Sequence, residues 1–211
     1  AVAPALPPLP AIPASSWIGL VVLGEQILIG VLLGFALRIT FAAVDVAGEL
    51  IGLQMGLGFA TFFDPDSGGQ TPVIAEFLGL LTALIFLALN GHLLALTVLT
   101  ESFTLLPVST TPIHAAAFSS MLAWSATLFS TGLLLALPLI TALLIANIAL
   151  GVLARIAQQL NLFSVGFPVT LALGFLVLML SLPYIGAAME GLFTKGFQAM
   201  AMVMRAAGSP L

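Results

Sequence analysis

The sequence predicts an all-α integral membrane protein, built of long, kinked helical hairpins. Of its 211 residues, 61% are hydrophobic and 6% are charged. So few charged side chains cannot cover the surface of a soluble domain of this size. Residues 77–100 form an uncharged apolar stretch, long enough for a helix to cross a hydrocarbon layer about 30 Å thick. Clusters of proline and glycine separate such stretches and predict the breaks between helices.

The chain opens with a proline-rich segment, residues 1–16, which predicts an extended loop because proline lacks a backbone donor. Ser15 and Ser16 then provide N-caps for a helix expected over 17–54. Within this helix, Gly30 and Gly34 have the small-xxx-small spacing that lets another backbone come close.

The stretch from Gly48 to Pro72 differs from the apolar helices around it. A plug-like loop is expected over 55–70, rich in glycine and aromatic residues and broken at Asp-Pro. On a regular helix Phe59 and Phe62 would share one face, as core residues do. The neighbouring glycines favour instead a hydrophobic plug, because apolar rings can close a pore by fit and dewetting. The residues alone leave both interpretations open.

The remainder predicts three more helical regions. A helix is expected over 71–106, with Pro72 in its first turn and a polar notch at Asn90-Gly91-His92. A loop over 107–117 precedes a helix over 118–160, which should kink at Pro138. After a turn over 161–168, helices are expected over 167–205, with Pro183 ending or kinking the first of them. The methionines of the last segment favour adaptable packing over a gasket.

No arrangement of residues predicts an enzyme, a metal site or a cofactor. The chain has no cysteine, which excludes disulfides and cysteine-type metal sites. Its two histidines lack the partners of a zinc motif. An intramembrane aspartyl protease needs two aspartates on facing helices, whereas Asp64 and Asp66 share one loop. Four cationic side chains and a net charge of −4 argue against nucleic-acid binding.

Ionisable residues inside the apolar helices support two interpretations. As coupling groups of an ion-coupled secondary transporter, Glu25, Glu49 and Glu101 would bind a cation, with His92 as a proton relay. As structural groups, the carboxylates would pair with Arg38 or Arg155 within or between subunits, and a neutral His92 would bond to its neighbours. We favour the structural interpretation.

Long motifs in order along the chain carry a family resemblance. They are residues 48–72, 86–92, 102–107, 136–138 and 165–168. Together they resemble the FliR-type family of flagellar type III secretion export-gate proteins over nearly the whole chain. Members of that family have a further helical segment ahead of the position of Ala1, so we expect a single export-gate domain over 1–211 that lacks this segment.

The resemblance implies a non-enzymatic export-gate subunit in the bacterial inner membrane, at the flagellar basal body. Its partners would be FliP-like, FliQ-like and FlhB-like subunits, and unfolded flagellar proteins would pass through the shared channel. The family's plug loop maps onto 55–70 and favours the plug interpretation of the aromatic residues. The implied plug and pore-lining residues are Met55, Gly56, Gly58, Phe59, Phe62, Phe63, Asp64 and Pro65. The implied inter-subunit polar contacts are Glu25, Arg38, Glu49, His92, Glu101 and Arg155.

Overall fold

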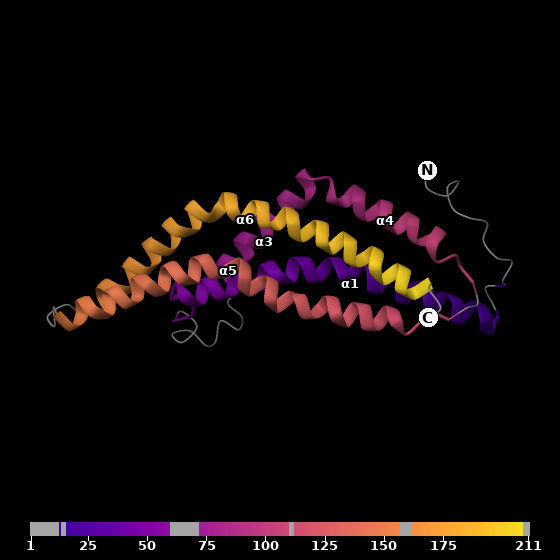
Figure 1. The fold of residues 1–211 in the computed structure, drawn as a ribbon, viewed down its shortest axis with the longest axis horizontal. Helices are drawn as coiled ribbons and strands as arrows, with labels where there is room; N and C mark the ends of the chain where they lie inside the picture. Colours follow the sequence, from indigo (N-terminus) through magenta and orange to yellow (C-terminus); the bar gives the residue numbers. More distant parts are fainter. Residues whose placement is uncertain (1–12, 14–15, 60–71, 110–111, 157–161, 209–211) are drawn as a thin grey trace. The chain divides into compact units, whose positions relative to one another are not determined.

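The protein is all-helical, as the composition predicts. The computed structural model describes residues 13, 16–59, 72–109, 112–156 and 162–208. Every regular element in these ranges is a helix (Figure 1). The elements are α1 (Trp17–Gln54), the short 3₁₀-helix η2 (Leu57–Phe59), α3 (Val73–Ala88), α4 (Gly91–Leu105), α5 (Ala116–Ile156) and α6 (Leu162–Gly208).

The start of α1 is fixed by a side-chain cap. The Ser16 Oγ accepts a hydrogen bond of 3.0 Å from the backbone N–H of Gly19 and donates one of 2.7 Å to the Pro13 carbonyl. The first N–H groups of a helix have no partner within it, and a serine at the N-cap supplies one. The predicted cap is confirmed for Ser16, whereas Ser15 lies outside the described residues.

The prediction of a single helix over 71–106 is wrong, because two helices occupy this range. α3 ends at Ala88, α4 begins at Gly91, and the pair is bent by 68° between them. Asn90 has φ 55° and ψ 30°, a left-handed conformation that asparagine adopts more readily than most residues. A Cβ on Gly91 would overlap the Phe86 ring. The polar notch of the sequence is therefore a corner of the backbone.

One predicted break is also wrong. A turn was expected over 161–168, but residues 162–168 belong to α6. Pro183 was expected to end or kink a helix; it does not end α6, which continues through both of its prolines. As expected, α5 is one helix that contains Pro138. The kinks at Pro138 and Pro183 stay predictions. Long apolar helices tolerate proline where their surroundings satisfy the freed backbone groups. α5 also begins two residues before the expected position, and 157–161 lie outside the described residues.

The chain divides into two compact units, each assembled from separate stretches of sequence. Unit 1 consists of Ala1–Thr40, Phe86–Leu128 and Glu190–Leu211. Unit 2 consists of Phe41–Ile85 and Phe129–Met189. Helices α1, α5 and α6 each supply residues to both units, so the core of each unit is formed by helices distant in sequence.

The core of unit 1 joins the first half of α1 to the start of α5 and the end of α6. Its buried side chains are Leu32, Leu33, Ala36, Ile39, Ala117, Met121, Met200, Val203, Met204 and Ala207. Methionine is unbranched and fills irregular gaps well. The burial of Met200 and Met204 confirms that methionines at the end of the chain pack into its core, although Met202 is exposed.

Unit 2 is held by close backbone approaches to α1. A Cβ added to Gly48 would overlap the backbone of Ala75 on α3. A Cβ added to Gly132 on α5 would lie 2.8 Å from the Ala43 carbonyl oxygen. Both glycines are buried. By contrast, Gly30 and Gly34 have no heavy atom near the position of an added Cβ, so the close approach expected at these two residues does not occur among the described residues.

Within the described part of the chain, three helices are long and apolar enough to cross a membrane. They are Trp17–Gln54, Ala116–Ile156 and Gly166–Gly208, and the bent pair α3 and α4 would make a fourth span. Only 39%, 22% and 17% of the most apolar stretch of each of the three is buried inside the chain. Most of their apolar surface must therefore contact lipid or other protein chains.

The glycine contacts generate a paired prediction for the isolated chain. We expect Gly48→Ala to destabilise it by about 1–3 kcal/mol, because the methyl group has no space beside α3. The matched control on the same helix, Gly34→Ala, should be neutral or stabilise by up to about 1 kcal/mol, because alanine is the better helix former. Thermal unfolding in detergent measures both, and equal effects would contradict the assigned contact.

Candidate gating segment

The segment that the sequence singles out begins where α1 ends, in unit 2. The last turns of α1 are closely packed on α3: Gly52 lies 3.7 Å from Ile74, measured from an added Cβ, and the Ile51 side chain is fully buried. The last turn of α1 before the segment is therefore held in place by its packing on α3, and we call this turn the base of the segment.

Met55 anchors this base to α6. Its side chain has no exposed surface, and its backbone N–H donates to the Ile51 carbonyl at 2.9 Å. A Cβ built on Gly174 would lie 2.6 Å from Met55 Cγ and 2.7 Å from Cε. An alanine at position 174 would require the Met55 side chain to shift. Met55 is thus a packed residue in this structure, and its place among the plug and pore-lining residues stays a prediction.

Gly56 ends the helical path. Its φ is 83°, a left-handed conformation that costs a residue with a Cβ about 1–2 kcal/mol and glycine little. Its N–H donates to the Leu53 carbonyl at 3.0 Å, which satisfies one of the carbonyls left free at a helix end. The chain then turns into η2, where Gly58 is half-buried and a Cβ would meet the flexible Leu53 side chain.

The aromatic part of the predicted plug lies largely beyond the described residues. Phe59 is the last residue of η2. Phe62, Phe63, Asp64 and Pro65 are outside the described residues. Their role in closing a pore stays a prediction.

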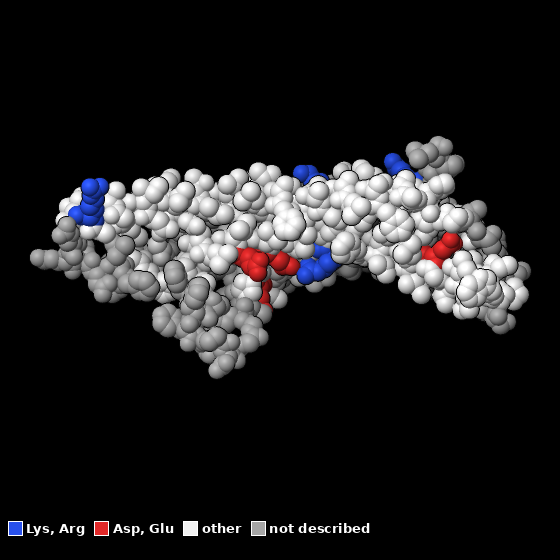
Figure 2. Space-filling model, turned by 90° about the horizontal axis from the view of Figure 1, so that it is seen from below, with Lys and Arg blue, Asp and Glu red and all other residues white. Residues whose placement is uncertain are grey.

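The ionisable residues singled out by the sequence are spread over several helices. Glu25 is half-buried on α1, and Arg38, Glu49, His92, Glu101 and Arg155 are exposed. Across the described ranges, no three acidic or histidine side chains gather where they could hold a metal ion. Figure 2 shows an almost uncharged surface on one face, with few acidic and basic side chains.

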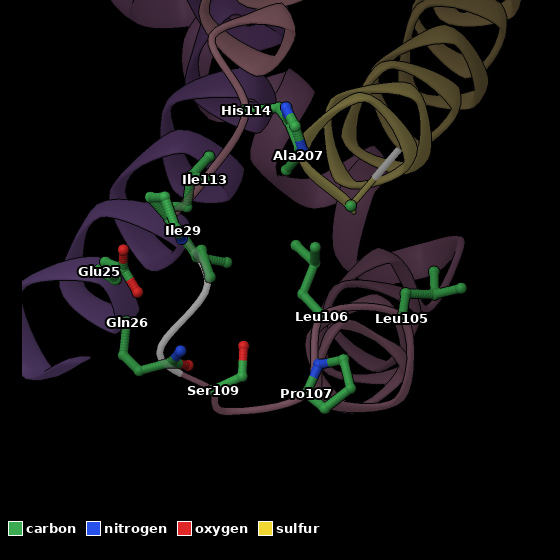
Figure 3. A pocket seen from close by; sticks show the side chains of 12 residues that line it. Glu25, Gln26, Ile29, Leu105, Leu106, Pro107, Ser109, Ile113, His114 and Ala207 are labelled. Atoms are coloured by element: carbon green, nitrogen blue, oxygen red, sulfur yellow. The ribbon is translucent and has the colours of Figure 1, made fainter. Parts of the chain in front are cut away.

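Glu25 lines a cavity of about 300 Å³ in unit 1. Figure 3 shows Glu25 and Gln26 on one side of it, and Leu105, Leu106 and Pro107, at the end of α4, on the other. His114 also lines the cavity, and its backbone N–H donates to the Ala207 carbonyl at 3.4 Å. Polar and apolar side chains both line the cavity, the polar ones being Glu25, Gln26, Ser109 and His114.

An all-helical chain with several helices of membrane-spanning length is typical of integral membrane proteins. The model of the family "bacterial export proteins, family 1" matches residues 1–196. The chain therefore belongs to this family, which is a family of transport components and not of enzymes.

Similar proteins show which kind of bacterial export protein the chain resembles. The chain is 49% identical to the flagellar biosynthetic protein FliR of Pectobacterium carotovorum, over 96% of this chain and 77% of the relative. It is 44% identical to FliR of Escherichia coli, over 97% and 78%. For FliR of Aquifex aeolicus the identity is 36%, over 88% and 72%. The chain is a FliR homologue of flagellar type III export, and the resemblance seen in the sequence is confirmed.

Two contacts in unit 2 could not be anticipated from the sequence. Gly174 lies in an apolar stretch with no local feature that indicates its contact with Met55. Asp45 on α1 also has no local feature that indicates its contact. In the structure it is half-buried and its Oδ1 lies 3.6 Å from a Cβ built on Gly79 of α3. Such contacts depend on how distant helices cross, which local patterns do not encode.

The contact between Met55 and Gly174 predicts that mutations of these two residues have non-additive effects on the free energy of unfolding. Met55→Ala should cost about 2–5 kcal/mol through the cavity it leaves, and Gly174→Ala about 1–3 kcal/mol through overpacking. Together they should cost at least about 1 kcal/mol less than their sum, because the new methyl occupies the vacated space. Thermal unfolding tests this cycle. Gly186→Ala on the same helix, where an added Cβ meets no atom within 4 Å, is the control, and additivity would contradict the anchor.

Proposed function

We propose that this chain is one subunit of the flagellar type III protein export gate in the bacterial inner membrane, at the flagellar basal body. It assembles with FliP-like and FliQ-like subunits, and with an FlhB-like subunit, around a channel for unfolded flagellar proteins. The observation that carries the proposal is the large apolar helical surface that the chain leaves uncovered in a member of an export family.

The uncovered surface supports helical partners in particular. Gly24, Gly30 and Gly34 on α1 are exposed and have no atom near an added Cβ. Lipid chains need no glycine, whereas another helix approaches most closely where side chains are small. The face of α1 that carries these glycines is therefore the surface we assign to a partner subunit.

Exposed polar and charged residues complement these apolar contacts. Glu49, His92, Glu101 and Arg155 are accessible to another chain, as is part of Glu25. In a nearly uncharged surface, such groups specify orientation and partner choice more than affinity. We assign them, together with Arg38, to polar contacts between subunits.

We propose further that the loop over 55–70 closes the channel when no substrate is present. Met55 and Gly56 supply its fixed base. The aromatic rings that follow would seal a narrow lumen by excluding water. An arriving unfolded chain would displace the loop beyond Gly56, while the buried thioether keeps its base in place.

The assembly is tested by co-expression with FliP-like and FliQ-like subunits and native mass spectrometry. We expect a defined hetero-oligomer that contains one copy of this chain. Gly30→Leu with Gly34→Leu should abolish it, because the side chains block the approach of a partner helix, without unfolding the isolated chain. A stable monomer or homodimer that ignores the partner subunits would contradict the proposal.

The plug is tested by conductance. Phe59→Ala with Phe62→Ala should leave the hetero-oligomer intact and raise ion leakage through it, because the smaller side chains no longer exclude water. The matched control replaces an exposed phenylalanine outside the loop, Phe129→Ala. If the double variant conducts no more ions than the control in planar bilayers, the aromatic seal is wrong.

A further inference from the structure

We propose that Trp124 of α5 and Thr40 of α1 use one carbonyl group in alternation, which makes the contact between α5 and α1 in unit 1 a reversible clasp. The inference rests on the hydrogen bonds of unit 1 and does not depend on the export function.

The clasp is visible in its closed form. The Trp124 indole Nε1 donates a hydrogen bond of 2.9 Å to the backbone carbonyl of Ala36. Ala36 is fully buried in the core of unit 1, and Trp124 packs against that core. The bond therefore ties the start of α5 to the middle of α1 through a carbonyl that already serves the α1 helix.

Thr40 is the residue that would ordinarily use this carbonyl. A threonine hydroxyl inside a helix commonly donates to the carbonyl four residues earlier. Thr82, Thr97 and Thr141 do so here, at 2.6, 2.9 and 2.7 Å. For Thr40 the equivalent acceptor is Ala36.

The Thr40 hydroxyl instead has no hydrogen-bond partner. Among the described residues, its oxygen is the only buried side-chain nitrogen or oxygen in this condition, and the residue is 1% exposed. A carbonyl oxygen has two acceptor sites. At Ala36 the helical N–H of Thr40 takes one and the indole takes the other, which leaves none for the hydroxyl.

The position of the Thr40 hydroxyl explains how the closed form tolerates a buried hydroxyl without a hydrogen-bond partner. A Cβ built on Gly196 of α6 would overlap Thr40 Oγ1, whereas Thr40 Cβ and Cγ2 lie farther away, at 3.5 and 3.7 Å. The hydroxyl oxygen therefore points at the α6 backbone, where a weak Cα–H···O contact is available. Such a contact does not replace a full hydrogen bond.

The two donors consequently define two states. In the closed state Trp124 holds Ala36 and the Thr40 hydroxyl lacks a partner. In the open state α5 moves away, the half-buried indole reaches solvent, lipid headgroups or another chain, and Thr40 rotates to donate to Ala36. When the clasp opens, the buried Ala36 carbonyl keeps a second hydrogen bond, because the Thr40 hydroxyl beside it replaces the indole as donor. The start of α5 can thus leave α1 more readily than its packing alone would permit.

A double-mutant cycle on the full chain in detergent tests the exchange. Thr40→Val keeps the shape of the side chain and removes the unpaired hydroxyl, so it should raise the apparent melting temperature by about 2 °C or more. In a Trp124→Phe background the hydroxyl is free to bond to Ala36, and Thr40→Val should then lower the melting temperature or leave it unchanged. An equal shift in both backgrounds, or a decrease in both, overturns the proposal.

A second measurement needs no change at Trp124. With Trp17→Phe, Trp124 is the only indole of the chain. Thr40→Val should favour the closed state and reduce quenching of Trp124 fluorescence by acrylamide, whereas Thr40→Ser keeps the hydroxyl and should leave quenching unchanged. If Thr40→Val leaves quenching unchanged, or if the two variants behave alike, Thr40 does not control the clasp.

Discussion

The close approach of chain segments at glycine residues is the constraint on which the structure depends. In unit 2, Gly48 meets α3, Gly132 on α5 meets the Ala43 carbonyl, and Gly174 on α6 accommodates Met55. In unit 1, Gly196 on α6 meets Thr40. Each contact is close because the glycine has no side chain. An apolar chain in an apolar environment gains little from burying more apolar surface, so close van der Waals packing has to specify which faces meet.

This constraint separates two kinds of glycine. Gly48, Gly132, Gly174 and Gly196 are buried against another helix of the same chain. The exposed glycines of α1 meet nothing within the described residues. The sequence presents both kinds with the same apolar neighbours, and only the crossing of distant helices distinguishes them. The first kind builds each unit, and the second kind is the surface that we assign to partner subunits.

The features predicted from the sequence are those that depend on local chemistry. Ser16 caps α1 because its side chain reaches an N–H three residues away, and composition alone requires long apolar helices. The corner at Asn90 was expected only as a polar notch, because an asparagine in a helical pattern does not reveal its left-handed conformation. A turn was expected to end at Pro168, but the surroundings of a long apolar helix tolerate a proline inside α6. For the gating segment, the sequence predicted a loop over 55–70, most of which lies outside the described residues, whereas the burial of Met55 against Gly174 depends on a tertiary contact.

That burial determines where a plug in this position could move. A segment that opens and closes a channel must be fixed at one end, since otherwise displacement would disturb the surrounding helices. Here the fully buried Met55 ends the packed region, and Gly56 follows in a conformation that glycine adopts with little strain. In the proposed plug, the change from fixed to displaceable chain falls at these two residues. Under the proposed function, substrate would act on the loop after Gly56, while the contacts of α1 with α3 and α6 in unit 2 stay intact. A methionine suits this boundary, because its flexible thioether can keep contact with the surface at Gly174 through small adjustments of the loop.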